Sequence, residues 1–477
     1  MGRSKNMISG NLGKGMLVFA IPVLLASLVN LMFNSVDIIV VGQFCGSHAV
    51  AAVGATSRIV NLVTFMFLGF AGGFGVVLSH ALGEGNKEKI SRAVHTAIPF
   101  AFVLGVILTA AGILLSKPLL DLLNTPEDIK HDANIYLKIY FAGVILRMIQ
   151  AFVGPIFRAV GDTKIPLIYL GIGGALNVVC NIFFVKVLGM TVDGVAYGTI
   201  ISEGVSSIIG IIVLMRRKDS IRFELKKMCF DKNVIKKTVQ IGVPNGLQTS
   251  MFTISTAIIS SAINSLGSTV VAANSAALSI DEIFLSSTVN AFNEAVAVYS
   301  GQNYGAGNYK RIREVLKKAL FMGLSITVVL GVLINVFSKP LVSIYITDSP
   351  EAVSLARMKM LISGGLYFLT CYRSIFAGTL RGMGNTKTPT VLSFFATCLF
   401  KVVWVYTVFR IPAYHSFVCL AISYPVAWLL EDIPITVLYF DFMKKTERAA
   451  RKKQEALEHR RLMQKKKYRK KLRSAKR

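Results

Sequence analysis

Long apolar runs recur along this 477-residue sequence and constrain its fold more than any other feature. A helix needs roughly 20 apolar residues to cross the hydrocarbon core of a bilayer. Twelve runs of about that length are bounded by charged or turn residues. They lie at about 15–41, 49–78, 92–115, 133–157, 165–188, 192–215, 238–263, 270–300, 315–337, 355–379, 388–409 and 413–440. The runs predict an all-α polytopic membrane protein with twelve transmembrane helices.

The composition agrees with this prediction. Apolar residues make up 53% of the chain and charged residues only 16%, whereas a soluble domain carries about 25% charged residues. These values exclude a soluble enzyme, a disordered chain and a small secreted scaffold. The formal net charge of +28 would suggest nucleic-acid binding in a polar chain, but not in one that is half apolar. No HExxH, GxSxG or CxxC motif occurs, so we expect no enzyme activity, no zinc site and no cofactor.

Basic residues are distributed unevenly between the loops. With a cytoplasmic N-terminus, 41 of the 53 Lys and Arg residues fall on inner segments and eight on outer segments. This bias follows the positive-inside rule. It predicts a multi-pass protein of the cell membrane with both termini in the cytoplasm.

The inner segments divide the chain into parts. We expect a cytoplasmic N-terminus at 1–14, a helix bundle at 15–215, a basic linker at 216–237, a second bundle at 238–440 and a basic tail at 441–477. The tail holds 17 Lys and Arg residues and three Glu. We expect residues 444–477 to lie on the anionic inner leaflet; RNA or ribosome binding is the alternative, and no specific nucleic acid is expected as a partner.

The two bundles share an internal repeat. Four segments of the first half recur in order in the second half at shifts of 221 to 223 residues. They are 46–52 with 267–273, 83–86 with 305–308, 116–120 with 338–342 and 157–166 with 380–389. Each half holds six spans, so both enter the membrane from the same side. Parallel repeats of this kind are typical of secondary transporters, which bind substrate between the bundles and alternate access to it.

The repeated motifs carry a family resemblance. Pro22 precedes Val36–Gly42 in the first span, Gly301–Gly307 follows the eighth span, and Arg381–Pro389 follows the tenth. Over about 12–440 the chain resembles the multidrug and toxic compound extrusion (MATE) transporters, of the prokaryotic type with an aspartate site in the N-terminal bundle. The resemblance implies a monomer that exports small organic, often cationic, compounds in exchange for inward H⁺ or Na⁺.

Asp37 is the leading candidate for ion coupling. A charged group within a span costs about 2.5–3.5 kcal/mol and needs a reason to be there. Burial favours a protonated carboxyl and a bound cation favours the carboxylate, so an acid here can exchange H⁺ or Na⁺. The alternative is a structural ion pair with Arg58. The resemblance implies that an acid at this position is the coupling group.

The resemblance adds three polar residues to this site. Asn177 and Asn181 lie four apart on one helical face, and Thr199 matches the remaining polar position. Many relatives have Asp where Asn181 stands, so the choice between H⁺ and Na⁺ stays open, with Na⁺ at Asp37 as one alternative. Hydrogen bonding between helices is the other interpretation of the asparagines.

The C-terminal bundle holds the candidates for substrate binding. Glu282 and Asp281 lie near mid-depth of the eighth span and point about 100° apart. Gln248 follows Pro244 in a seventh span that has no acid, which favours coupling in the N-terminal bundle. Glu294 is a candidate contact of an inner gate.

Other charges within the spans are expected to pair across helices or to reach the membrane surface. They are Arg147, Arg373, Glu203, Lys401, Glu431 and Asp432. The embedded part holds seven acids and four bases, which favours cation exchange over anion binding. A flippase for lipid-linked precursors is the runner-up function, because Arg58, Arg147 and Arg373 could bind a pyrophosphate. A receptor whose tail recruits a partner is a third.

Overall fold

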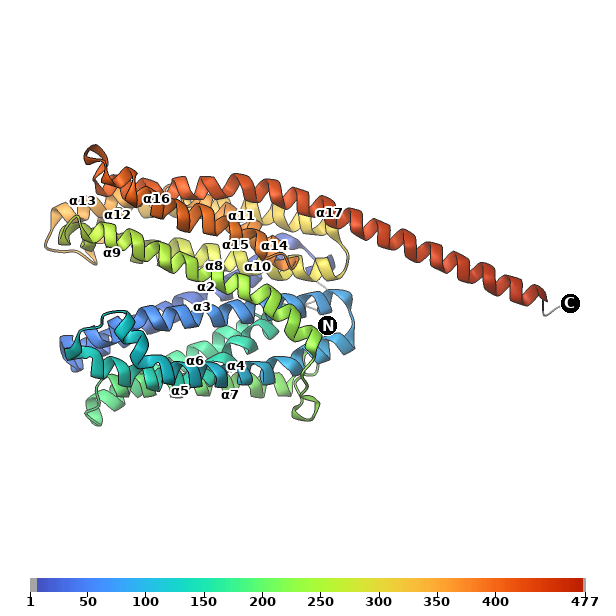
Figure 1. Ribbon diagram of the computed structural model, residues 1–477, viewed down its shortest axis with the longest axis horizontal. Helices are drawn as coiled ribbons and strands as arrows, with labels where there is room; N and C mark the ends of the chain where they lie inside the picture. The colour runs from blue at the N-terminus through green and yellow to red at the C-terminus, as the bar shows by residue number, and fades with distance from the viewer. Residues whose placement is uncertain (1–6, 475–477) are drawn as a thin grey trace.

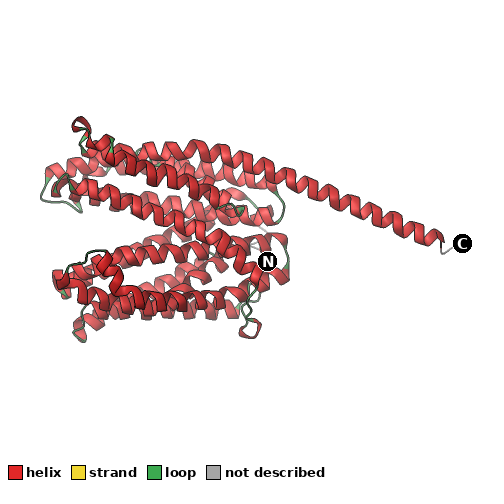
Figure 2. Cartoon of the chain, viewed as in Figure 1, coloured by secondary structure: helices red, strands yellow, loops and turns green. Residues whose placement is uncertain are grey.

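Two layers of roughly parallel helices form the protein (Figure 1). This computed structural model describes residues 7–474, and every regular element in that range is helical (Figure 2). The first layer contains α2 (Leu12–Phe44), α3 (Gly46–Glu84), α4 (Lys87–Leu122), α5 (Glu127–Ala159), α6 (Lys164–Ile182) with the π-helical turn η1 (Phe183–Val187), and α7 (Val192–Arg216). We call it the N-terminal half.

The second layer, the C-terminal half, has more interrupted helices. It contains α8 (Lys232–Asn264), α9 (Ser268–Asp281), η3 (Glu282–Ser286), α10 (Ser287–Gly305), α11 (Tyr309–Val336), α12 (Ser338–Ser343), α13 (Pro350–Lys359), η4 (Met360–Gly364), α14 (Phe368–Gly382), α15 (Lys387–Ser393), η5 (Phe394–Leu399), α16 (Phe400–Tyr406) and α17 (Phe417–Ser474). The turns η3, η4 and η5 are π-helical and stand in the middle of spans.

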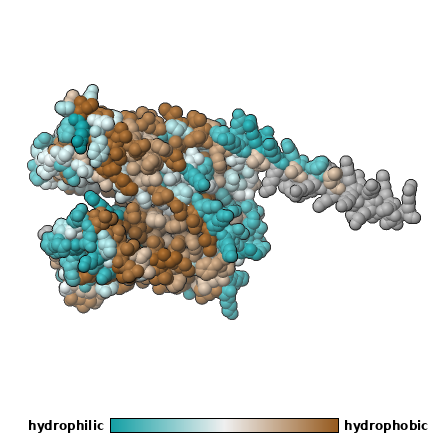
Figure 3. All heavy atoms as spheres, viewed as in Figure 1, coloured by the Kyte–Doolittle hydropathy of each residue, from teal (hydrophilic) through white to brown (hydrophobic). Residues whose placement is uncertain are grey.

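Nine described helices are long and apolar enough to cross a membrane, and the bent pair Pro350–Gly364 and Phe368–Gly382 makes a tenth. The two other expected spans are present as α8 and as the run from α9 through η3 to α10. Both are rich in Ser, Thr and Asn, because both line a polar cavity described below. On the face seen in Figure 3, apolar residues form a belt between two more polar ends.

The last helix extends far beyond the belt. α17 is one continuous helix of 58 residues, so the basic tail continues the twelfth span without a break (Figure 1). Of the expected terminal segments 1–14 and 441–477, residues 1–6 and 475–477 lie outside the described residues. We call the end from which the tail projects the tail end, and the opposite end the far end.

The loop between the halves, within the expected linker 216–237, is fixed to the N-terminal half. The backbone amide of Glu224 donates to His95 Nε2 at 3.0 Å, and Arg217 pairs with Asp162 at 2.8 Å. The side chain of Asp231 then caps α8 by accepting from the amides of Val234 and Asn233. These bonds to the charged carboxylate lower the pKa of Asp231 below its usual value.

The two halves touch backbone to backbone at the tail end, as well as further along α3 and α8 at Gly69 and Gly246. A Cβ on Gly83 would clash with the carbonyl oxygen of Gln302, and a Cβ on Gly305 would clash with that of His80. Across the same contact His80 Nε2 lies 2.7 Å from the carbonyl oxygen of Gly382. Because small residues let helix backbones touch, the halves are closed against each other here. At the far end a notch separates them (Figure 3).

Candidate functional site

The four residues expected at the acid site lie together in the N-terminal half. Asn181 Nδ2 donates to Asp37 Oδ1 at 2.5 Å, which joins α6 to α2. Asn177 Oδ1 accepts from Asn181 at 3.4 Å, and Asn177 Nδ2 donates to Thr199 Oγ1 of α7 at 3.4 Å. The acid of α2 is therefore bonded by one neutral amide of α6, and the cluster continues through a second amide of α6 to a hydroxyl of α7.

One atom of this cluster has no partner. Asn181 is fully buried, and its Oδ1 accepts no hydrogen bond within the described part of the chain. It lies against Gly198, where a Cβ would clash with it. Arg58 is exposed, and no ion pair links it to Asp37 among the described residues. The acid is thus bonded by an amide nitrogen rather than by an arginine, and the same amide carries an oxygen without a partner in the described part of the chain.

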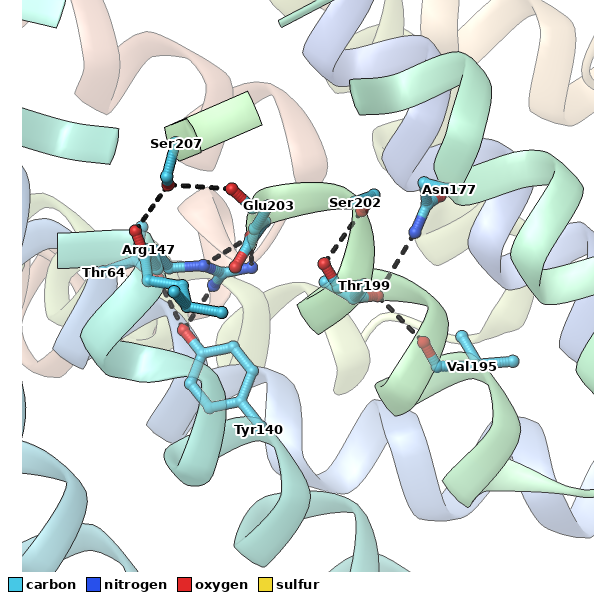
Figure 4. A network of polar contacts seen from close by, with 10 residues as sticks. Thr64, Tyr140, Arg147, Asn177, Val195, Thr199, Ser202, Glu203 and Ser207 are labelled. Atoms are coloured by element: carbon cyan, nitrogen blue, oxygen red, sulfur yellow. Dashed lines mark hydrogen bonds and ion pairs between the residues drawn. The ribbon is translucent and has the colours of Figure 1, made fainter. Parts of the chain in front are cut away.

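An ion pair stands next to the acid site, as Figure 4 shows. Arg147 of α5 pairs with Glu203 of α7, and the Nε–Oε1 distance is 2.7 Å. Arg147 also donates to Tyr140, whose hydroxyl bonds Thr64 of α3 at 3.0 Å. Glu203 lies one turn from Thr199 on α7, so the pair shares a helix face with the acid site. This network fixes α3, α5 and α7 around Asp37.

A separate cavity lies in the C-terminal half. It has a volume of about 630 Å³ and is lined almost entirely by that half; α3 contributes Asn61 and Phe65. Volumes of 300–1,000 Å³ are usual for small-molecule sites. All three expected substrate contacts, Gln248, Asp281 and Glu282, line this cavity.

The π-helical turns place charged side chains on the cavity wall. Glu282 begins η3, Lys359 directly precedes η4, and Lys401 follows η5 by two residues. Each turn is closed by a bond from residue i+5 to residue i, such as the amide of Gly365 to the carbonyl of Met360 at 3.2 Å. Such turns are frequent at functional sites because they rotate the residues that follow.

Two arginines on the wall are already neutralised. Arg373 pairs with the fully buried Glu431 at 2.8 Å, and Glu431 also accepts from Ser393 at 2.6 Å. Arg381 pairs with Glu294 at 3.2 Å. The arginines that could suggest a pyrophosphate site are thus dispersed: Arg58 is exposed, Arg147 is paired, and Arg373 has a partner.

The charge balance of the cavity differs from that of the spans as a whole. Its described lining includes four basic residues, Lys359, Arg373, Arg381 and Lys401, and two acids. Sequence reasoning missed Lys359 as a site residue and grouped Lys401 with residues that pair or reach the surface. Lys401 does neither, because it is 3% exposed and pairs with no carboxylate in the described range. The sequence does contain a signal for Lys401, because it is a lone lysine within an apolar run and has no acid one helical turn away to pair with.

Glu294 lies where the halves are closed. Besides Arg381, its carboxylate approaches Arg158 of the N-terminal half, with the Nε–Oε2 distance at 3.7 Å. Arg158 and Arg381 are equivalent in the repeat. One acid thus interacts with corresponding arginines of both halves at the tail end.

Twelve spans in two repeated bundles, with polar sites inside the bundles, are the architecture of a secondary transporter. The MatE family model matches residues 22–183 and 244–407. The chain therefore belongs to the MATE family of transporters.

Individual relatives cover most of the chain. It is 27% identical to "Probable multidrug resistance protein YoeA" of Bacillus subtilis over 80% of this chain and 84% of that protein. It is 23% identical to a "FAD transporter" of Shewanella oneidensis over 81% and 86%. An outward-facing multidrug resistance MATE family transporter superposes with a TM-score of 0.86 at 19% identity, over 93% of this chain and 98% of that one. These similarities establish the two-bundle fold.

Proposed function

We propose that the protein exports amphipathic organic compounds from the cell, driven by inward movement of H⁺ or Na⁺ through the Asp37 site. The observation that carries the proposal is the half-buried carboxylate of Asp37, bonded by Asn181 and flanked by Asn177 and Thr199. A buried acid among neutral polar groups can be neutralised by a proton. Side-chain oxygens of this kind also bind hard cations.

Transport needs two states with different affinities for the ion and the substrate. The closed contact at the tail end, through Gly83 and Gly305, supports a state that is open toward the far end. With the tail in the cytoplasm, that state would release substrate outside and admit the ion. Names of relatives such as YoeA, a probable multidrug resistance protein, support organic compounds as cargo.

The test is efflux of ethidium, a cationic aromatic dye, from proteoliposomes under separately imposed Na⁺ and pH gradients. We expect one gradient to drive efflux by the unaltered protein, and Asp37→Asn to abolish that gradient-driven component. The loss follows because an amide cannot take up a proton and binds a cation weakly. Efflux by Asp37→Asn at the unaltered rate would reject the assignment.

A matched control is Asp348→Asn, which makes the same chemical change at an exposed acid in the loop between α12 and α13. It should leave efflux unchanged. The runner-up, a flippase for lipid-linked precursors, is not favoured, because Arg58, Arg147 and Arg373 do not form a common anion site.

A further inference from the structure

Lys401 is a buried cation for which the protein supplies no counter-charge. It stands on α16, is 3% exposed and lines the C-terminal cavity. Within residues 7–474 its Nζ forms no hydrogen bond and no ion pair, and it lies 3.9 Å from the centre of the Tyr424 ring. Buried charges are normally paired, because an isolated charge in an apolar environment is costly. Attraction to the ring offsets only part of that cost.

A second ammonium group lies beside the same ring. Lys359 is 1% exposed, donates to Asn274 Oδ1 at 2.6 Å, and lies 5.8 Å from the centre of the Tyr424 ring. Two cations around one aromatic ring repel each other unless an anion joins them. The wall thus contains a region of positive potential.

The acids of the wall do not neutralise Lys401. Asp281 accepts from Ser363 at 3.3 Å, and Glu282 is exposed to the cavity. Neither forms an ion pair with Lys401 in the described structure. By contrast, the nearby Arg373 has Glu431, so an incoming anion would find Lys401 free and Arg373 occupied.

An aromatic surface adjoins the two lysines. Tyr367 and Tyr424 both pack against Trp428, at ring-centre distances of 5.5 Å and 6.3 Å, and all three line the cavity. These rings can cover the apolar body of a flat molecule. The tyrosine rings are inclined at 65° and 64° to the Trp428 ring, so the cavity combines aromatic walls with an unpaired cation beside Tyr424.

We propose that Lys401, assisted by Lys359, binds the carboxylate or phosphate group of an aromatic organic anion whose rings pack on Tyr424 and Trp428. The inference rests on the proposed export function and adds a substrate class to it. An oxyanion would supply the missing counter-charge through a charge-assisted hydrogen bond.

Binding of three matched probes tests the inference. They are 2-naphthoate, its neutral methyl ester and 2-naphthylmethylammonium, titrated calorimetrically against the full chain in zwitterionic lipid nanodiscs without a gradient. We expect the carboxylate to bind about tenfold or more tightly than the ester, as charged hydrogen bonds do. Equal or tighter binding of the ester or the ammonium compound by the unaltered protein would overturn the inference without any variant.

Variants then assign the preference to one side chain. Lys401→Met should abolish the preference for the carboxylate while ester binding persists, and Lys401→Arg should retain part of it. Lys401→Met should also raise the unfolding midpoint, because it removes an unpaired buried charge. Lys339→Met, at an exposed lysine of α12, is the control. An unchanged preference in folded Lys401→Met would reject the role of Lys401.

A further probe separates soluble cargo from a lipid-linked one. Farnesyl diphosphate presents the same oxyanion chemistry on a prenyl chain. If it bound more tightly than 2-naphthoate and lost affinity in Lys401→Met, the oxyanion role of Lys401 would stand, and aromatic cargo would be rejected. These titrations need no ion gradient, so failure of Asp37-dependent efflux and failure of the anion site are distinguishable.

Discussion

The two halves share one repeat but contain opposite polar interiors. The N-terminal half surrounds a single acid, Asp37, with the neutral amides of Asn177 and Asn181. The C-terminal half has a cavity whose wall holds four basic residues and two acids. The comparison shows that the two copies of the repeat kept the same arrangement of helices, while the charged residues in their interiors came to differ. Under our two proposals, the N-terminal half exchanges a small cation and the C-terminal half binds a larger charged molecule.

Equivalent positions show how complete the divergence is. By the shifts of the repeat, Asp37, Asn177 and Asn181 correspond to Ile258, Phe400 and Trp404. In the other direction Lys359 and Lys401 correspond to Leu137 and Val178. Each site is thus replaced by apolar residues in the other copy.

The largest expected effect is a difference in the free energy of unfolding between variants that break the internal ion pair of each half. Arg373 and Glu431 are 7% and 0% exposed in their side chains, whereas Arg147 and Glu203 are 20% and 17% exposed. Arg373→Met leaves a fully buried carboxylate and should cost about 3–5 kcal/mol. Arg147→Met should cost less, about 1–3 kcal/mol, because water already reaches that pair.

Reversible unfolding in detergent measures both changes. The double variant Arg373→Met/Glu431→Gln should recover much of the loss, because it removes the unpaired charge together with its partner. If Arg373→Met and Arg147→Met lowered the free energy of unfolding equally, the difference in burial between the two ion pairs would not determine their contribution to stability.

A smaller effect is expected for a substitution at the contact between the halves, where it should change how often the tail ends separate. Gly305→Ala would clash with the carbonyl oxygen of His80, and overpacking of this kind costs about 1–3 kcal/mol. The variant should therefore favour a state separated at the tail end. Spin labels at the repeat-equivalent positions Lys164 and Lys387, in a cysteine-free background, should report a larger share of long distances.

Gly54→Ala is the control for this measurement. No atom lies within 4 Å of a Cβ at that position of α3, so the same substitution should leave the distance distribution unchanged. An identical distribution for Gly305→Ala would show that this contact does not hold the halves together.

The smallest effect concerns the helix caps that begin each half. Asp231→Ala and Asn11→Ala should each cost about 1 kcal/mol, since each removes a side-chain acceptor from a helix start. The Asp231 cost should depend on pH. Its folded pKa is lowered, so its contribution is present at neutral pH and disappears as the pH falls through that pKa.

Thermal unfolding at several pH values tests this difference. The gap between the unaltered protein and Asp231→Ala should narrow in acid, whereas the gap for Asn11→Ala should stay constant, because an amide does not titrate. Asp231→Asn should remove the pH dependence and retain most of the stability. A constant gap for Asp231→Ala would contradict a charged cap.

Much of the fold could be predicted because apolar length alone reports a span. The gathering of Asp37 with Asn177, Asn181 and Thr199 came from the resemblance to the MATE family, and the hydrogen bonds place these side chains together. Gln248, Asp281 and Glu282 were expected in the C-terminal bundle, and all three line its cavity, whereas their contact with substrate stays a prediction.

The charge of that cavity could not be predicted from the sequence. The direction of Lys401 depends on the π-helical turn η5, which precedes it and shifts the helical register, and apolar periodicity does not reveal such a turn. The count of acids and bases over whole spans included side chains that pair outside the cavity. It therefore did not give the charge of the side chains that face the cavity. The partner of Arg373, for instance, is Glu431 on α17, which lies 58 residues further along the sequence.

Because α17 is one continuous helix, any rotation of its membrane-spanning part also rotates the tail. About 34 residues follow the membrane span, which at 1.5 Å per residue is about 50 Å of rigid helix. A rotation of the C-terminal half by about 10° would sweep the tip through roughly 9 Å by the same geometry. A small tilt of the C-terminal half therefore moves the end of the tail by a larger distance. A fluorescent label at the exposed position Met463 would report that displacement.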